Sequence, residues 1–272
     1  MILPTKVDFA FLDSGTGGLP YMLYLKEHFP DCSCVYLADT KNFPYGEKSP
    51  QEIIDASSQA IELLIKNFSP QVIVIACNTI SVTALDVLRK RFSVPFVGTV
   101  PAIKLAAKIS KNKRIGLLAT EQTVSHCYTD KLILDFASDC VVIKRGDRDL
   151  VRFIEKYLFH VSKTETEKAV MPAISFFQKQ QVDTIILGCT HFIHVGTVIQ
   201  SLVGDEVQVV DSREGVVKQA LKLYTPQEKT ELTIPDKSFF TTALYSEQMK
   251  DDYCSIAKTL DIPWGGLLQE TK

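Results

Sequence analysis

The stretch VIVIACNTIS, residues 72–81, decides the fold and raises a chemical question. Its first half is a short apolar run rich in β-branched residues, which predicts a buried strand at 72–77. The run ends in Cys77, and the polar side chains of Asn78 and Thr79 follow, for which packing alone gives no reason. The stretch TIILGCTHF, residues 184–192, is built in the same way around Cys189. This duplication indicates two related half-sites, each at the end of a strand.

Further apolar runs alternate along the chain with stretches of helical period, a pattern typical of parallel sheets covered on both faces. The predicted fold class is therefore α/β, with a pseudo-twofold pair of domains facing one cleft. The predicted strands are 7–13, 34–38, 72–77, 95–98, 115–119, 140–143, 184–189, 207–211 and 239–242. The predicted helices are 50–68, 79–92, 121–136 and 163–180, and residues 225–238 are expected to form a loop.

Composition narrows the function classes. The 272 residues are 46% apolar and carry a formal charge of -2, with a pI near 6.2, so no basic excess favours nucleic acid. The apolar runs are too short to cross a bilayer, and the first residues lack the pattern of a signal peptide. Seven cysteines, an odd number, favour reduced thiols over a disulfide framework. Together these features predict a cytoplasmic protein.

Polar groups also follow the first two predicted strands. In open parallel sheets, ligands bind beyond the carboxyl ends of the strands. Asp13 and Ser14 stand at such an end, before Gly15-Thr16-Gly17-Gly18, a turn that could hold an anion or be only a tight connection. It lacks the lysine of a P-loop. The segment 42–46, which contains Tyr45 and Gly46, is an ordinary turn or the lining of a small polar pocket.

Two thiols on opposite sides of one pocket fit racemisation at an amino-acid Cα. One residue removes the proton from one face, and the other delivers a proton to the opposite face. Each must serve as base in one direction and as acid in the other, which requires a pKa near the operating pH. Cysteine, with an ordinary pKa of about 8.5, meets this better than a carboxylate or a lysine.

Other interpretations stay open on the residues alone. Cys189, His191 and His194 could ligate zinc, although no CxxC pair accompanies them. One thiolate with a histidine could act as a cysteine hydrolase, which leaves the second cysteine without a role. A non-catalytic amino-acid-binding protein is a third possibility. Glu155 lies on a predicted amphipathic helix, where a solvated charge is the usual interpretation.

Five motifs carry a resemblance to a known family. DSGTGGL at 13–19, ADTKNFPYG at 38–46, IACNT at 75–79, ATEQT at 119–123 and LGCTH at 187–191 occur in the order and at the spacing of the glutamate racemases, within the aspartate/glutamate racemase family. The resemblance covers nearly the whole chain. It implies a cofactor-independent isomerase that interconverts L- and D-glutamate for bacterial peptidoglycan synthesis, and hence for cell wall biogenesis and cell shape.

The resemblance also implies an organisation and a set of roles. Two α/β domains, 1–98 with 209–272 and 99–208, would hold the active site in the cleft between them. Cys77 and Cys189 would exchange the proton, assisted by Asp13, Glu155 and His191. Neither a cofactor nor a metal is expected, and glutamate is the expected partner, with a homodimer possible and no nucleic acid or membrane. The residues implied to bind the substrate are Asp13, Ser14, Tyr45, Gly46, Asn78, Thr79, Thr120, Thr123, Thr190 and His191.

Overall fold

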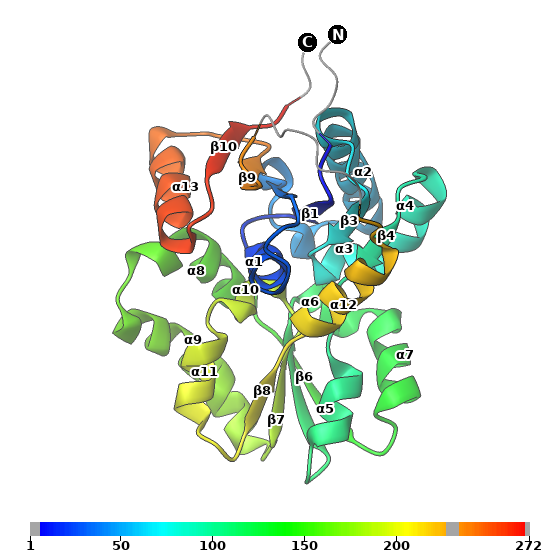
Figure 1. The fold of residues 1–272 in the computed structure, drawn as a ribbon. Coiled ribbons are helices and arrows are strands. Elements are labelled where there is room, and N and C mark those ends of the chain that lie inside the picture. The colour runs from blue at the N-terminus through cyan, green and yellow to red at the C-terminus, as the bar shows by residue number, and fades with distance from the viewer. Residues whose placement is uncertain (1–5, 227–233, 270–272) are drawn as a thin grey trace. The chain divides into compact units, whose positions relative to one another are not determined.

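The computed structural model describes residues 6–226 and 234–269. The chain splits into two compact units, Met1–Thr99 with Arg213–Lys272 and Val100–Ser212. Each unit holds one sheet whose paired strands are all parallel, with helices packed on it (Figure 1). The α/β fold class is therefore confirmed. The domain bounds expected from the resemblance stay a prediction about which segments fold together.

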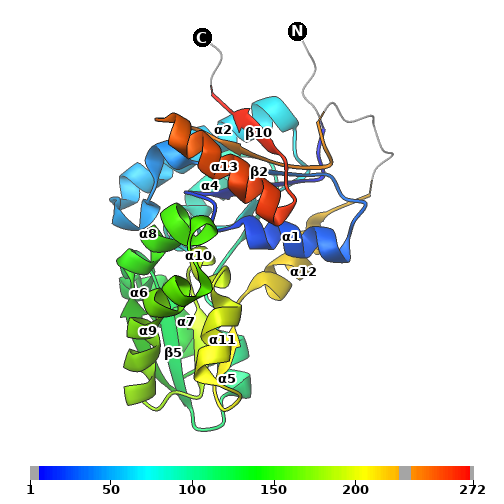
Figure 2. The ribbon, with the colours of Figure 1, turned by 90° about the vertical axis from the view of Figure 1, so that its left-hand side faces the viewer.

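The described residues of the first unit form a sheet of six strands, in the order β10-β9-β2-β1-β3-β4. Helices α1 and α12 pack on each other, and α13 lies beside β10 (Figure 2). Helix α2 packs on α3 and α4. The strands are β1 (Phe9–Asp13), β2 (Cys34–Ala38), β3 (Val72–Ile75), β4 (Phe96–Gly98), β9 (Lys237–Thr241) and β10 (Trp264–Leu267). The helices are α1 (Leu19–His28), η1 (Thr40–Asn42), η2 (Tyr45–Glu47), α2 (Pro50–Phe68), α3 (Asn78–Thr83), α4 (Leu85–Arg91), α12 (Arg213–Leu223) and α13 (Glu247–Leu260).

The sheet of the second unit has four strands, in the order β6-β5-β7-β8. Helix α5 packs on α7, and α9 packs on α11 (Figure 1). The strands are β5 (Arg114–Ala119), β6 (Val141–Gly146), β7 (Thr184–Leu187) and β8 (Gln208–Val210). The helices are α5 (Ile103–Ile109), α6 (Glu121–Ser125), α7 (Cys127–Phe136), α8 (Arg148–Tyr157), η3 (Leu158–His160), α9 (Lys163–Lys179), α10 (Thr190–Ile193) and α11 (Gly196–Val203).

Local sequence explains where the long helices begin. Ser49 caps α2 by accepting from the backbone N–H of Glu52, whose carboxylate accepts in return from the Ser49 N–H. Ser162 and Glu165 form the same capping box at the start of α9. Each box satisfies donors that a helix start otherwise leaves unpaired, so both helices begin where the sequence predicts. The four residues of β3 and the four of β7 are all buried, as expected of central strands in parallel sheets.

Two predicted helices were wrong in extent, and one strand was not predicted. The helix expected at 79–92 is two helices, because the backbone at Ala84 turns to φ −115°, ψ −18° between α3 and α4. The helix expected at 121–136 breaks at His126, whose extended backbone and ring nitrogen cap α7. Strand β10 contains Gly265 and Gly266, which weaken a strand pattern. The loop expected at 225–238 lies in part outside the described residues, and β9 already begins at Lys237.

No helix among residues 6–226 and 234–269 is long and apolar enough to cross a membrane.

The strand register brings polar groups together at the carboxyl edge of each sheet. In the first unit Leu12 lies opposite Ile75, so the residues after β1 are adjacent to those after β3. Ala38 lies opposite both Asp13 and Thr241, which adds the segments after β2 and β9 to the same edge. In the second unit Leu118 lies opposite Leu187, so the segments after β5 and β7 are adjacent.

Candidate active site

Both cysteines occupy the same local position in their units. Each stands two residues beyond its strand in extended backbone, with φ −146°, ψ 117° at Cys77 and φ −127°, ψ 136° at Cys189. Each is the N-cap residue of the helix that follows, α3 or α10, and each is buried. The start of a helix presents backbone N–H groups without intrahelical partners. The duplicated sequence pattern therefore corresponds to a duplicated backbone arrangement.

Close packing at the residue before each cysteine depends on a glycine. A Cβ added at Gly18 would lie 2.6 Å from the carbonyl oxygen of Ala76, the residue before Cys77. A Cβ added at Gly188, the residue before Cys189, would lie 2.6 Å from a methyl carbon of Leu117. The small residues of both motifs thus let neighbouring strand ends approach closely.

Two carboxylates and a phenol lie at the Cys77 end of the first unit. Asp13 is fully buried, and its Oδ1 accepts from the Ser14 N–H at 2.7 Å. Tyr45, on η2, is fully buried in the same apolar cluster as Cys77. Burial raises the pKa of the Tyr45 phenol well above its ordinary value, as do the nearby charge of Asp39, its hydrogen bond, and the charges of Cys77 and Asp13. Tyr45 is therefore neutral at physiological pH.

Asn78 supplies an open acceptor beside Cys77. The residue is buried, and its Oδ1 has no hydrogen-bond partner. An unpaired buried carbonyl oxygen costs about 1–3 kcal/mol, which a ligand that donates a hydrogen bond would recover. Thr79, the next residue, is also buried. The Cys77 end thus combines a thiol, carboxylates and an unpaired acceptor.

An imidazole and a carboxylate line up behind the thiol of Cys189. Its Sγ lies 3.8 Å from Nδ1 of His191, and Nε2 of His191 lies 2.9 Å from Oε2 of Glu155 on α8. Burial by itself lowers the pKa of His191, but the hydrogen bonds and charges of Cys189 and Glu155 outweigh it and raise that pKa well above its ordinary value. His191 is therefore poised to carry a proton, and an imidazolium stabilises a neighbouring thiolate.

Hydroxyl groups occur near the strand ends of the second unit. Thr120 directly follows β5 and caps α6, and its Oγ1 donates to Oγ1 of Thr123 at 3.0 Å and accepts from the Thr123 N–H at 3.2 Å. Thr123 and Thr190 are buried. Because β5 is the neighbour of β7, Thr120 belongs to the same edge as Cys189.

The predicted residues fall into two groups, one in each unit. The first unit holds Asp13, Ser14, Tyr45, Gly46, Cys77, Asn78 and Thr79. The second holds Thr120, Thr123, Glu155, Cys189, Thr190 and His191. Within the second unit, the contact from Glu155 to His191 places the Glu155 carboxylate beside the imidazole, with its side chain only 10% exposed.

Two residues at the Cys77 end were not predicted as site residues. They are Asp39, which follows β2 directly, and Thr242, which follows β9. Their position just after a strand was the signal that could have identified them. Of the zinc ligands considered, His194 packs its ring against Phe159 with centroids 5.6 Å apart. Within the described parts of the chain, no group of three or more His, Cys, Asp or Glu side chains is arranged to hold a metal ion.

Comparison with known proteins places these residues in a family context. The model of the Asp/Glu/hydantoin racemase family matches residues 23–220. A glutamate racemase of Treponema pallidum (strain Nichols) is 41% identical over 263 residues, which cover 97% of each chain. A glutamate racemase of Pasteurella multocida is 36% identical over 262 residues, 96% of this chain and 95% of the relative.

A solved structure shows the same fold. The Escherichia coli glutamate racemase, crystallised with L-glutamate and an activator, superposes with a TM-score of 0.83 at 29% identity. The match covers 98% of this chain and 100% of that one. The similarity therefore extends over both units and not over one sheet alone.

Proposed function

The chain belongs to the Asp/Glu/hydantoin racemase family, and we infer that its reaction is the interconversion of L- and D-glutamate. It is an isomerase, as its relatives are. The observation that carries the inference on the molecule itself is the repeated strand end. Two buried cysteines stand at the N-cap positions of two helices, each beside its own acid–base groups. A racemase needs two like residues, one as the base for each direction of the reaction, and this need would explain why the arrangement occurs twice.

We propose that Cys77 and Cys189 act on opposite faces of one glutamate Cα. In one direction the thiolate of one cysteine takes the Cα proton and becomes a thiol, while the thiol of the other gives its proton to the opposite face and becomes a thiolate. The reverse direction exchanges the two roles. The net change is inversion at Cα, with no change in the number of protons on the pair of sulfurs. One active site would thus need residues from both units.

The neighbouring groups would prepare each thiol. His191, held by Glu155, would stabilise the Cys189 thiolate and take or return its proton through the contact of 3.8 Å. Asp13 would do the corresponding work near Cys77. The proton on the substrate carbon is weakly acidic, so hydrogen bonds that strengthen as negative charge develops are needed.

The substrate would be held by the remaining polar residues. The unpaired Oδ1 of Asn78 suits a donor such as the α-ammonium group of an amino acid. Ser14, Thr79, Thr120, Thr123, Thr190 and the turn at Tyr45 and Gly46 offer hydroxyl and backbone donors for the two carboxylates. The E. coli relative was crystallised with L-glutamate, which supports this choice of substrate.

The wider setting is also part of the proposal. The D-glutamate produced would serve peptidoglycan synthesis, in the cytoplasm, with neither cofactor nor metal taking part. None of the seven cysteines forms a disulfide, which suits a reducing compartment. A homodimer is a further prediction that light scattering would test.

The decisive test of activity is incubation of the purified protein with L-glutamate, and separately with L-aspartate, followed by chiral chromatography. We expect an equal mixture of enantiomers from glutamate and little or no D-aspartate. Rapid racemisation of aspartate but not of glutamate would overturn the substrate assignment.

A second candidate arises from the line of Cys189, His191 and Glu155, which also suits a thiol hydrolase. Such an enzyme forms an acyl-cysteine intermediate with an ester or amide of glutamate. Intact-protein mass spectrometry after rapid quenching would detect the added acyl mass. We expect none, because racemisation breaks only the bond from Cα to hydrogen.

A further inference from the structure

Asp39 is a buried carboxylate at the Cys77 end to which the proposed mechanism gives no part. It is 2% exposed and stands directly after β2. Its Oδ2 accepts from the Tyr45 hydroxyl, in a short hydrogen bond, and from Nδ2 of Asn42 at 2.9 Å. Its Oδ1 accepts from Oγ1 of Thr242 at 2.7 Å. A carboxylate taken from water at this depth needs such donors, and here they come from three separate segments.

The backbone groups of Asp39 and of Ala38, the residue before it, join neighbouring strand ends. The Asp39 N–H donates to the carbonyl of Asp13 at 2.8 Å, and the Thr242 N–H donates to the carbonyl of Ala38 at 3.1 Å. The Thr242 hydroxyl also accepts from the Lys41 N–H at 3.0 Å. Asp39 is thus the meeting point of the segments that follow β1, β2 and β9.

The hydrogen bond from Tyr45 to Asp39 determines which further hydrogen bonds the phenol can make. A phenol has one hydrogen to donate, and Asp39 accepts it, so the lone pairs of the Tyr45 oxygen remain available only as acceptors. The phenol stays neutral beside Cys77, because burial and the charge of Asp39 raise its pKa. The turn that carries it, η2, packs against α3, the helix that Cys77 caps.

We propose that Asp39 is a positioning residue of the Cys77 half-site, whose carboxylate, held by Thr242, fixes the Tyr45 phenol and the η2 turn against the start of α3. The inference rests on the proposed role of Tyr45 and Gly46 in binding the substrate. Asp39 itself touches no reacting atom. It acts by fixing the direction in which the Tyr45 O–H points and by holding the Tyr45 backbone in place. The phenol oxygen, as an acceptor, and the backbone N–H groups of the turn are then already oriented when the substrate binds.

The central experiment is a double-mutant cycle on Asp39→Asn and Tyr45→Phe, measured as kcat and KM for glutamate. An asparagine keeps the size of Asp39 but presents only one acceptor atom, so the phenol loses its carboxylate partner. We expect kcat/KM to fall about 10- to 100-fold in Asp39→Asn, mainly through a higher KM, because the affected groups bind the substrate. The double variant, which combines Asp39→Asn with Tyr45→Phe, should have a kcat/KM within about threefold of that of the more impaired single variant.

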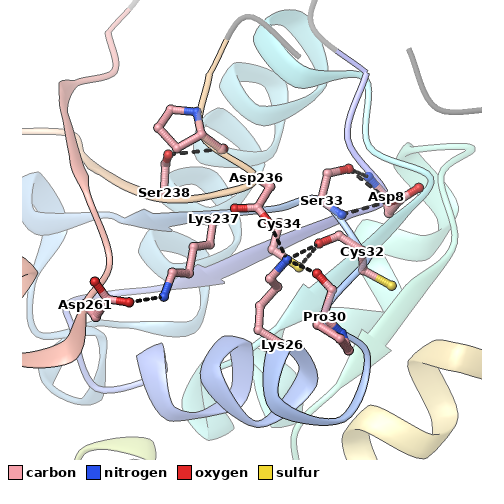
Figure 3. A network of polar contacts seen from close by, with 11 residues as sticks. Asp8, Lys26, Pro30, Cys32, Ser33, Cys34, Asp236, Lys237, Ser238 and Asp261 are labelled. Atoms are coloured by element: carbon pink, nitrogen blue, oxygen red, sulfur yellow. Dashed lines mark hydrogen bonds and ion pairs between the residues drawn. The ribbon is translucent and has the colours of Figure 1, made fainter. Parts of the chain in front are cut away.

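Asp8 offers a matched control in the same sheet. It precedes β1, at the opposite end of the strands from Asp39. Its carboxylate accepts from the Ser33 N–H at 2.8 Å and the Ser33 hydroxyl at 2.9 Å (Figure 3). It also accepts from Nε2 of Gln71 at 3.0 Å. Asp8→Asn removes an equivalent tie between neighbouring segments, far along the strands from the thiol. A merely structural loss lowers the fraction of active enzyme and hence kcat, but leaves KM unchanged. We expect that pattern, or no change, for Asp8→Asn.

A second pair of variants keeps the test decisive if Asp39→Asn does not fold. Thr242→Val removes the hydroxyl that donates to Asp39, whereas Thr242→Ser keeps it. We expect KM to rise about 3- to 10-fold in Thr242→Val and to stay within about twofold of the original in Thr242→Ser. Circular dichroism and thermal unfolding would show which variants are folded.

The outcomes separate the inference from the proposed function. A higher KM in Asp39→Asn and Thr242→Val, with non-additivity toward Tyr45→Phe, supports the positioning role. An unchanged KM in both, or multiplicative losses in the cycle, overturns it. Absence of glutamate racemisation in the original protein and in Asp8→Asn would instead overturn the proposed function, whatever the Asp39 variants do.

Discussion

The Cys77 end and the Cys189 end share a backbone and differ in chemistry. In both, a fully buried four-residue strand leads through a small residue to an N-capping cysteine. Around Cys77 lie carboxylates and a neutral phenol, whereas Cys189 faces an imidazole backed by Glu155. The strand and the helix start that carry the thiol are thus duplicated. The groups that would exchange a proton with the thiol differ between the two units.

This difference has a consequence for the reaction. Because L- and D-glutamate have equal free energies, kcat/KM must be the same in both directions for any variant. The two directions can still differ in kcat and in KM, since each begins with a different thiolate. Unequal surroundings of the two sulfurs therefore predict unequal kcat values for L- and D-glutamate.

Removal of either thiol should have the largest effect. We expect Cys77→Ser and Cys189→Ser each to lower kcat/KM for racemisation by about 10³-fold or more, because a hydroxyl is too weakly acidic to replace a thiol in proton transfer. The matched control is Cys254→Ser, at an exposed cysteine on α13, which should keep the original rate. A chiral assay checks this, and full activity in either of the first two variants would refute the pair of bases.

The imidazole of the Cys189 end should give the next largest effect. We expect His191→Gln to lower kcat/KM about 100-fold and Glu155→Gln about 10-fold, since Glu155 acts only through the histidine. His194→Gln is the control. His194 is the C-cap residue of α10, the helix that carries His191, and its ring packs against Phe159. Steady-state rates from both enantiomers would check the order. A loss in His194→Gln as large as in His191→Gln would refute the special role of His191.

Replacement of Gly18, near Cys77, and of Gly188, before Cys189, should lower the stability of the protein by different amounts. A Cβ at Gly18 meets a backbone oxygen, which cannot move cheaply, whereas a Cβ at Gly188 meets mainly the end of the Leu117 side chain. We expect Gly18→Ala to lower the free energy of unfolding by about 1–3 kcal/mol and Gly188→Ala by less. Gly215→Ala on α12, where a Cβ meets nothing within 4 Å, should be neutral or stabilising. Urea unfolding would measure all three, and equal losses in the first two would contradict this ranking.

The smallest effect concerns pH. The pKa of His191 is raised in the folded protein, so above about pH 6.5 the folded state keeps a proton that the unfolded chain loses. The resulting stabilisation is complete below the ordinary histidine pKa and is lost as pH rises through the raised value. Its slope is at most about 1.4 kcal/mol per pH unit. The free energy of unfolding of the original protein should fall more steeply with pH than that of His191→Gln. Parallel curves would contradict the raised pKa.

Much of the fold could be predicted from the sequence, because its buried strands are apolar runs with clear ends. Strand β2 has the predicted bounds. Strands β3 and β7 end two residues early because their pairing stops at Ile75 and Leu187, although the cysteines beyond keep an extended backbone. The helices that broke, at Ala84 and His126, did so through local backbone geometry that helical periodicity does not report.

The site was less accessible to sequence reasoning. The thiols were identified by their repeated pattern, but Glu155 looked like a solvated charge, and only the fold brings it to His191, 36 residues away. Its predicted role came from the resemblance. Asp39 and Thr242, 203 residues apart, meet because β2 and β9 are neighbours in the sheet. No local pattern encodes that pairing.

The most direct measurement follows Cα hydrogen exchange in deuterated water for Cys77→Ser and Cys189→Ser by mass spectrometry. Each variant keeps one thiol and so should exchange the Cα hydrogen of only one enantiomer of glutamate, without inverting it, and the two variants should prefer opposite enantiomers. Exchange of the same enantiomer by both variants, or of both enantiomers by one, would contradict the assignment of one sulfur to each face.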